Sequence, residues 1–329
     1  MLRRAATIAP LVALAFACAD ADTDTDGFDP DNLPALDFDA YHTYEEVVQY
    51  LEDVAEVADG IATYAVAGQS VEGRDLAYLV IDATGAQSPP AVFLNGSHHG
   101  NEWPATEALL GFVDYALRHL DDPVVAEGLD HFAVYVLPLV NPDGFAAGTR
   151  ENANGVDINR DYAGPTIDES AAFAEVETQA MKALIDEAAF VAAANYHTGA
   201  TAVLWPWGCT GEPTAAAADL AAIGEAMALA MGFDTYLQSY DDLPTEGEFL
   251  DYAYFKTGTL ALTVEASDVK TPAATALPDL VAAAVDGTLV LLREARAVDE
   301  GGVKSVSYPS PSVGARHVVQ LDADGNKLE

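Results

Sequence analysis

Hydrophobic residues along this chain form two kinds of pattern that alternate. Short, continuous apolar runs of five to seven residues are typical of buried strands, and longer stretches with apolar residues every three or four positions are typical of helices. The apolar runs cover residues 91–95, 132–137, 190–196 and 260–264. The helical patterns cover residues 44–58, 104–119, 169–188, 215–230 and 276–295. This alternation predicts a sheet with helices on both faces.

A further pair of short strands is predicted nearer the start. Residues 63–66 and 76–81 flank the turn Glu72-Gly73-Arg74, which indicates an edge hairpin. We therefore expect an α/β fold. It is a single domain over residues 38–300, with a mixed, mostly parallel twisted sheet of about eight strands covered by helices on both faces.

Two polar positions follow the predicted strand 91–95. His99 and Glu102 are three residues apart where the strand pattern changes into a helix pattern, and His197 follows another apolar strand. Because α/β sheets bind ligands at the carboxyl ends of their strands, these side chains are candidates for one metal site. Two imidazoles and a carboxylate suit a catalytic zinc that keeps a position open for water. His98 is an alternative ligand, and spacing alone does not decide between it and His99.

Other charged residues occupy positions suited to catalysis. Glu265 ends an apolar strand, where a carboxylate is costly unless a metal or a cation lies opposite. It is the candidate base for a water on zinc. Arg150, Asn159 and Arg160 fall in one irregular polar segment and could bind an anion, because guanidinium groups pair with carboxylates in bidentate geometry.

The charge of the chain excludes one class of partner. The 53 acidic residues outnumber the 14 basic ones, which gives a formal charge of −39. Nucleic acid is excluded as a partner because phosphate binding needs clustered Lys and Arg. The acidity indicates a strongly hydrated surface or attraction of cationic substrates. We expect a monomer.

The two ends differ from the middle. Residues 1–18 carry Arg3 and Arg4 before an apolar run, which is typical of an export signal, and we expect a secreted or envelope-anchored protein. Cys18 could carry a lipid anchor, the expected contact with a membrane, or plain cleavage could occur there. Residues 19–37 are expected to form an acidic, disordered tether, and residues 301–329 a short appendage. Cys209 is the second of only two cysteines, so no internal disulfide is expected.

Four motifs in order resemble the carboxypeptidase A superfamily of zinc metallocarboxypeptidases, over roughly residues 44–296. They are His-Gly-Asn-Glu at 99–102, Gly-Thr-Arg-Glu-Asn-Ala-Asn-Gly-Val-Asp-Ile-Asn-Arg-Asp-Tyr at 148–162, Asn-Tyr-His at 195–197 with Leu-Trp-Pro-Trp-Gly at 204–208, and Asp-Tyr-Ala-Tyr at 251–254 leading to Thr-Val-Glu at 263–265. The resemblance implies a secreted or lipid-anchored bacterial enzyme that hydrolyses the C-terminal bond of peptides and proteins.

The resemblance also implies a role for each residue. His99, Glu102 and His197 would bind one Zn²⁺ per chain, which selects His99 over His98. Glu265 would be the general base toward the zinc-activated water. Arg150 would stabilise the oxyanion. Asn159 and Arg160 would hold the C-terminal carboxylate of the substrate.

Substrate preference is less well marked in the sequence. The lid tyrosine of the family corresponds by counting to Leu243, but an insertion would keep Tyr240 in that role. Leu250 falls at the floor of the specificity pocket, which implies a preference for apolar or aromatic C-terminal residues. Against this, four acids near the lid could attract a cationic side chain: Asp241, Asp242, Glu246 and Glu248.

Two alternatives remain. The same residues could act on cell-wall muropeptides, as a γ-D-glutamyl or diaminopimelate peptidase or amidase. A zinc-binding pseudoenzyme would lack Glu265 or Arg150, and both are present.

Overall fold

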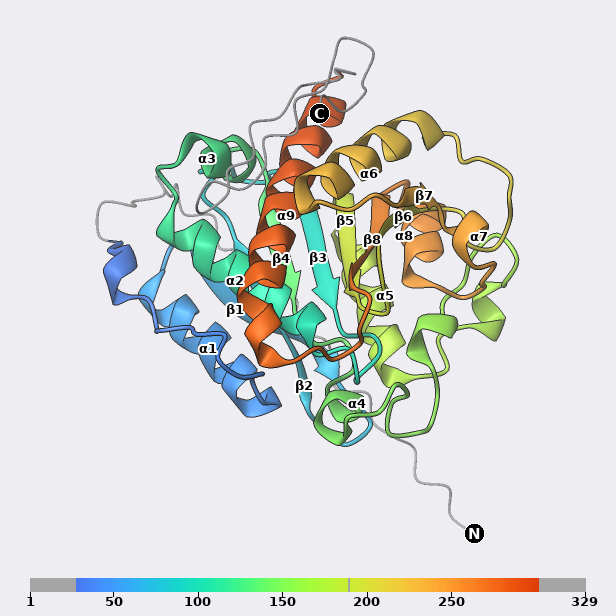
Figure 1. The fold of residues 1–329 in the computed structure, drawn as a ribbon, viewed down its shortest axis with the longest axis horizontal. Helices are drawn as coiled ribbons and strands as arrows, with labels where there is room; N and C mark the ends of the chain where they lie inside the picture. Colours follow the sequence, from blue (N-terminus) through green and yellow to red (C-terminus); the bar gives the residue numbers. More distant parts are fainter. Residues whose placement is uncertain (1–27, 189, 302–329) are drawn as a thin grey trace.

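A computed structural model describes residues 28–188 and 190–301. An eight-stranded sheet lies at its centre, in the order β1-β2-β4-β3-β5-β8-β6-β7 (Figure 1). The strands are β1 (Ala62–Gln69), β2 (Asp75–Ile81), β3 (Ala91–Gly96), β4 (Ala133–Leu137), β5 (Phe190–His197), β6 (Ala200–Trp205), β7 (Tyr236–Gln238) and β8 (Leu260–Ser267). The helices are α1 (Tyr44–Val57), α2 (Pro104–Arg118), α3 (Pro123–Leu129), α4 (Pro142–Ala147), α5 (Val176–Glu187), α6 (Ala217–Met231), α7 (Ser239–Asp242), α8 (Phe249–Thr257) and α9 (Leu277–Asp299).

The sheet is parallel in its middle and has antiparallel pairs on both sides of that middle, and its edge strand β7 is parallel to β6. Strands β4, β3, β5 and β8 run parallel to one another. Strand β2 joins β1 and β4 in antiparallel pairs, and β6 is antiparallel to β8. The predicted α/β fold with a mixed, mostly parallel sheet is confirmed, and β1 is the outer strand of the predicted edge hairpin.

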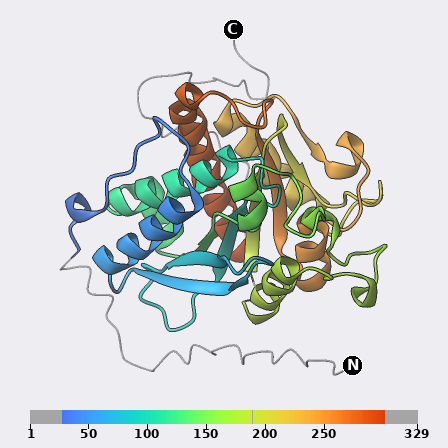
Figure 2. The same cartoon turned by 90° about the horizontal axis from the view of Figure 1, so that it is seen from below.

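Each face of the sheet has its own core. Along β3, Val92 and Leu94 point into the core beneath α1, α2, α6 and α9, and Phe93 points into the core beneath α5 and α8. In Figure 2, α9 and α5 accordingly lie on opposite sides of the sheet. Side chains alternate across a strand, so continuous apolar runs are required to fill both cores.

Local signals account for helix starts. Thr43 and Glu46 form a reciprocal capping box at the start of α1, which satisfies backbone N–H groups that the helix leaves free. The helix predicted over 169–188 is shorter than expected and begins at Val176. Phe173 has a φ of 56°, and the Asp161 carboxylate accepts the N–H groups of Ala174 and Glu175, so the chain turns before α5.

The segment before α1 differs from the expected tether. Residues 28–37 pack on the domain, with Leu33 buried and the Arg118 guanidinium donating to the carbonyls of Pro30 and Pro34. The predicted signal, Cys18, the first part of the tether and residues 302–329 of the appendage lie outside the described residues.

Helix α9 is apolar on most sides. The stretch Ala274–Asp299 is long and apolar enough to cross a membrane by length and composition, and 56% of its most apolar window is buried inside the domain. It packs against α2 and α6, as a core helix does.

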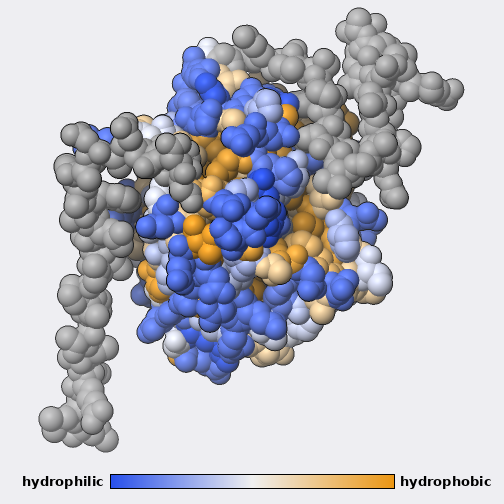
Figure 3. Space-filling view, turned by 90° about the vertical axis from the view of Figure 1, so that its left-hand side faces the viewer, coloured by the Kyte–Doolittle hydropathy of each residue, from blue (hydrophilic) through white to orange (hydrophobic). Residues whose placement is uncertain are grey.

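On the face in Figure 3, hydrophilic residues predominate and hydrophobic ones form scattered patches between them.

Candidate metal centre and active site

The candidate site lies at the carboxyl ends of three neighbouring parallel strands. His197 ends β5 and pairs in register with Glu265, which lies two residues before the end of β8, and Gly96 at the end of β3 pairs with Tyr196. His99 and Glu102 follow β3 in the turn that leads to α2. Residues separated by more than 160 positions are therefore brought together at one edge of the sheet, as the sequence predicts.

Three buried side chains converge here. His99 Nδ1 lies 3.0 Å from Glu102 Oε1, and His197 Nδ1 lies 2.8 Å from Glu102 Oε2. The two imidazole Nδ1 atoms are 3.1 Å apart. Among the described residues, these three are the one group of three or more His, Cys, Asp or Glu side chains whose donor atoms could hold a metal.

Two residues that the sequence analysis did not single out orient the imidazoles. His197 Nε2 lies 2.6 Å from Asn195 Oδ1, and His99 Nε2 lies 3.2 Å from Asp157 Oδ1. Both partners are acceptors, so each Nε2 carries the proton and each Nδ1 presents its lone pair to the shared space. Such contacts to the second ring nitrogen are the usual support of metal-binding histidines.

His98 is not part of this group. Its Nε2 lies 2.8 Å from the Tyr162 hydroxyl, and its Nδ1 accepts the Asn195 amide at 2.9 Å. Burial, and then the neighbouring His197, hold the pKa of His98 well below its ordinary value. Both ring nitrogens have partners away from the cluster, so the geometry favours His99 as the ligand.

Glu102 is the centre of charge in the cluster. Burial alone would raise the pKa of its carboxyl, but the adjoining His197 and His99 outweigh burial and lower it. Lys270 Nζ donates to Glu102 Oε1 at 2.7 Å, and the Thr198 N–H donates to Oε2 at 3.1 Å. Glu102 is thus held ionised, as a metal ligand must be. The sequence analysis did not identify Lys270, which lies five residues after Glu265.

Glu265 is partly buried beside this cluster and differs from Glu102 in its environment. Its Oε2 atom is buried without a hydrogen-bond partner among the described residues. Burial, and then the charge of Glu102, raise the pKa of Glu265 to about 8. A carboxylate with a free oxygen and a raised pKa is suited to exchange protons near neutral pH.

Arg150 extends from the irregular segment toward the metal ligands. Its Nη1 lies 3.1 Å from His99 Nδ1 and 3.7 Å from Glu102 Oε1. Its Nε and Nη2 donate to Asp157 Oδ2 at 3.0 and 2.7 Å. Asp157 therefore fixes both Arg150 and His99, and Arg150 Nη1 is directed at the metal centre.

Asn159 and Arg160 lie together on the adjoining 3-10 turn, Ile158–Arg160. Asn159 is buried, its Nδ2 lies 3.4 Å from His197 Nε2 and its Oδ1 accepts the Phe249 N–H at 3.0 Å. Arg160 Nη1 donates to the Asn159 carbonyl at 2.7 Å and to Glu248 Oε1 at 3.1 Å. The structure thus places Asn159 against the metal cluster and Arg160 against a carboxylate.

The predicted lid and pocket residues lie farther along the chain. Tyr240 is in α7, its N–H bonds the Trp207 carbonyl, and its ring lies next to Gly211. Leu243, the alternative by counting, is 61% exposed. Leu250 is 1% exposed and belongs to the core beneath α8. The roles of Tyr240 and Leu250 toward a substrate stay predictions.

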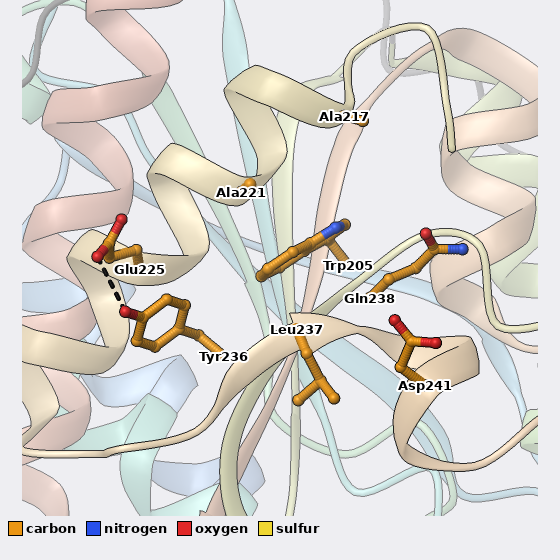
Figure 4. A pocket seen from close by; sticks show the side chains of 8 residues that line it. All are labelled: Trp205, Ala217, Ala221, Glu225, Tyr236, Leu237, Gln238 and Asp241. Carbon is orange, nitrogen blue, oxygen red and sulfur yellow. Dashed lines mark hydrogen bonds between the residues drawn. The ribbon is translucent and has the colours of Figure 1, made fainter. Parts of the chain in front are cut away.

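A hollow of about 430 Å³ lies elsewhere, between α6 and β7. Trp205 and Tyr236 form its apolar sides, and the carboxylate of Glu225 accepts the Tyr236 hydroxyl (Figure 4). None of the predicted metal-binding, catalytic or substrate-clamp residues lines it, although Asp241, one of the four acids near the predicted lid, does.

Comparison with known proteins agrees with this arrangement. A model of the zinc carboxypeptidase family (Peptidase_M14) matches residues 47–285, which include every predicted metal ligand. The chain belongs to the zinc carboxypeptidase family. The resemblance inferred from the four motifs is confirmed.

Individual relatives are more distant. Carboxypeptidase M of Mus musculus is 31% identical over 186 residues, which is 53% of this chain and 42% of the relative. Carboxypeptidase B of Helicoverpa zea is 29% identical over 228 residues, 59% of this chain and 52% of the relative. The chain thus spans about half the length of these curated relatives. The crystal structure of carboxypeptidase A from Helicoverpa armigera has a TM-score of 0.73 at 25% identity, over 80% of this chain and 76% of that chain.

The donor set fits the metal of the family. Two imidazole Nδ1 atoms and one ionised carboxylate face a common space, and the unpartnered Glu265 Oε2 lies beside it. This is the ligand type of a catalytic zinc with three protein ligands. The prediction of zinc as the cofactor is confirmed, and His99, Glu102 and His197 are the residues that would hold it.

Proposed function

We propose that this protein is a metallocarboxypeptidase that hydrolyses the C-terminal peptide bond of peptides. The observation that supports this most directly is the register pairing of His197 with Glu265. It places a carboxyl with a free oxygen and a raised pKa next to a two-histidine, one-carboxylate metal centre.

The chemistry divides between the metal and this chain. When bound, zinc supplies a Lewis acid and lowers the pKa of water toward neutrality. Glu265 accepts the proton of the attacking water and later returns it to the leaving amine. The partial burial of Glu265 limits the contact of that proton with bulk water.

The arginines position the substrate and stabilise charge. Arg150 Nη1, directed at His99 and Glu102, lies where negative charge develops on the scissile carbonyl oxygen, and a preformed donor there stabilises the transition state. Arg160, with Asn159 beside it, binds the free carboxylate of the substrate. This clamp explains an exopeptidase, because only a terminal residue offers that carboxylate.

The apolar preference predicted from Leu250 stays a prediction, because Leu250 lies in the core and offers almost no exposed surface. From the basic and apolar start of the chain we also propose export, either as a secreted protein or with a lipid at Cys18.

The test is the release of single C-terminal residues. Purified protein is incubated with peptides of varied C-termini, with and without a zinc chelator, and the products are identified by mass spectrometry. Loss of one C-terminal residue that stops on chelation supports the proposal. A zinc-loaded protein that trims none of these peptides contradicts it, and cleavage of muropeptides by that protein would favour the cell-wall alternative.

A further inference from the structure

A carboxylate that the proposed reaction does not use lies beside the substrate clamp. Glu248 precedes α8, and its side chain is 13% exposed. Its Oε1 accepts Arg160 Nη1 at 3.1 Å. Arg160 is the residue that we assign to the carboxylate of the substrate, so Glu248 lies next to the place of the C-terminal residue.

The other oxygen of Glu248 lies close to Gly208 and to the Thr245 side chain. A Cβ atom built on Gly208 would lie 2.7 Å from Glu248 Oε2 and 2.9 Å from Thr245 Oγ1. The absence of a side chain at Gly208 therefore leaves room for both oxygens. The segment 206–209 is held close by Asp251, whose two oxygens accept the N–H groups of Gly208 and Cys209 at 2.8 and 3.0 Å.

The charge around Arg160 changes when a substrate arrives. Without substrate, the guanidinium and the Glu248 carboxylate balance each other. A substrate carboxylate on Arg160 would place two carboxylates around one guanidinium, and a partly buried negative charge without a partner is costly. A positive charge on the side chain of the same C-terminal residue restores the balance.

The reach of such a side chain fits this arrangement. In a C-terminal residue the carboxylate and the side chain leave the same α-carbon, so a side chain bound at this clamp starts close to Glu248. Burial raises the pKa of Glu248 and Arg160 opposes that rise. A cationic partner would likewise favour the ionised form.

We propose that Glu248 selects substrates whose C-terminal residue has a cationic side chain, such as lysine or arginine. This inference rests on the proposed carboxypeptidase function and gives its substrate class. It differs from the apolar preference that Leu250 predicts, and one set of peptides separates the two.

The experiment compares peptides that are identical except for the last residue. Lysine and norleucine match in shape and differ in charge, and phenylalanine provides an aromatic reference. We expect the zinc-loaded wild type to show a kcat/KM about 10- to 100-fold higher for lysine than for norleucine, as for a charge-assisted hydrogen bond. In Glu248→Gln this ratio should fall to within about threefold of one, with phenylalanine cleavage retained.

A matched control removes a charge from the same segment. Glu246 is exposed and lies two residues earlier, so Glu246→Gln should keep the lysine preference. A wild type that cleaves norleucine as well as lysine overturns the inference without any variant. A lysine preference that survives in Glu248→Gln also overturns it. Cleavage of none of the peptides by the wild type overturns the proposed function itself, and this inference with it.

Discussion

Glu265 and His197 occupy matching register positions on neighbouring parallel strands, so a metal ligand and a proton acceptor are fixed side by side by backbone hydrogen bonds. The separation of the two groups depends on strand pairing, which a rigid sheet maintains. Each can therefore be changed with little effect on the place of the other.

The first prediction concerns Glu265 as the base. Glu265→Gln should lower kcat by a factor of at least roughly 10²–10⁴, because the amide cannot accept the proton of water. Zinc content and the thermal unfolding midpoint should stay near those of the wild type. Kinetics and metal analysis on the same preparation check this. As a control, Glu212→Gln at an exposed position should leave kcat, zinc content and the thermal unfolding midpoint unchanged. Near-normal hydrolysis by Glu265→Gln would contradict the assignment.

The second prediction separates the metal ligand His197 from His98, whose ring lies beside it. His197→Ala removes a ligand and should lower zinc occupancy strongly. His98→Gln should leave occupancy unchanged, because both nitrogens of His98 are engaged by Tyr162 and Asn195. Metal analysis after dialysis against a weak chelator provides the measurement. Full zinc occupancy in His197→Ala would mean that another residue is the third ligand.

The third prediction concerns the acceptor behind His197. Asn195→Ala removes the oxygen that lies 2.6 Å from His197 Nε2, and zinc affinity should fall about 10- to 100-fold. Like Asn195→Ala, Asn195→Asp loses the amide group that donates to Asn95 and His98, but it keeps an oxygen acceptor beside His197 Nε2. Competition with a zinc indicator measures both variants. Equal affinities in the two would show that the acceptor does not support the ligand.

The fourth prediction tests the packing of the turn that carries the ligands. A Cβ on Gly100 would lie 2.0 Å from the Gly144 carbonyl carbon, and this backbone cannot move aside easily. Gly100→Ala should lower the free energy of unfolding by about 1–3 kcal/mol. At Gly164 the nearest atom is 3.8 Å away, so Gly164→Ala is the matched control and should be near neutral. Urea unfolding distinguishes the two, and equal stability would contradict the close approach.

Much of this arrangement could be predicted from the sequence. Apolar runs mark the central strands, and polar residues that follow them collect at one sheet edge, so His99, Glu102, His197 and Glu265 could be placed together. Helix α8 was missed because the apolar residues over Phe249–Thr257, interrupted by Asp251 and Lys256, show no clear helical period. The predicted helix over 169–188 was too long, since the turn at Phe173 depends on the distant Asp161.

The supporting residues could not be found in this way. Asp157 contacts His99 across 58 positions, and Lys270 contacts Glu102 across 168. Neither spacing leaves a pattern in the sequence, because the sheet order creates the contacts. The likeness to a family assigned His99 over His98, and the structure gives the physical reason in the two partners of His98.

The last prediction is a pH dependence of stability in the metal-free protein. The pKa of Glu265 is raised from an ordinary value of 4.5 to about 8, mainly by burial. Between these values the folded protein keeps a proton that the unfolded chain has lost. The free energy of unfolding should therefore fall as pH rises from 4.5 to 8, and this contribution should level off above that range.

Glu265→Gln removes this titration, so the stability of the variant relative to the metal-free wild type should rise with pH across the same window. Chemical unfolding of both proteins at several pH values provides the measurement. Bound zinc opposes the rise in the pKa of Glu265, because a nearby dication favours the carboxylate. The stability difference between wild type and Glu265→Gln should therefore change less with pH when both proteins are zinc-loaded. A stability difference that does not change with pH in the metal-free proteins would show that burial does not raise the pKa of Glu265.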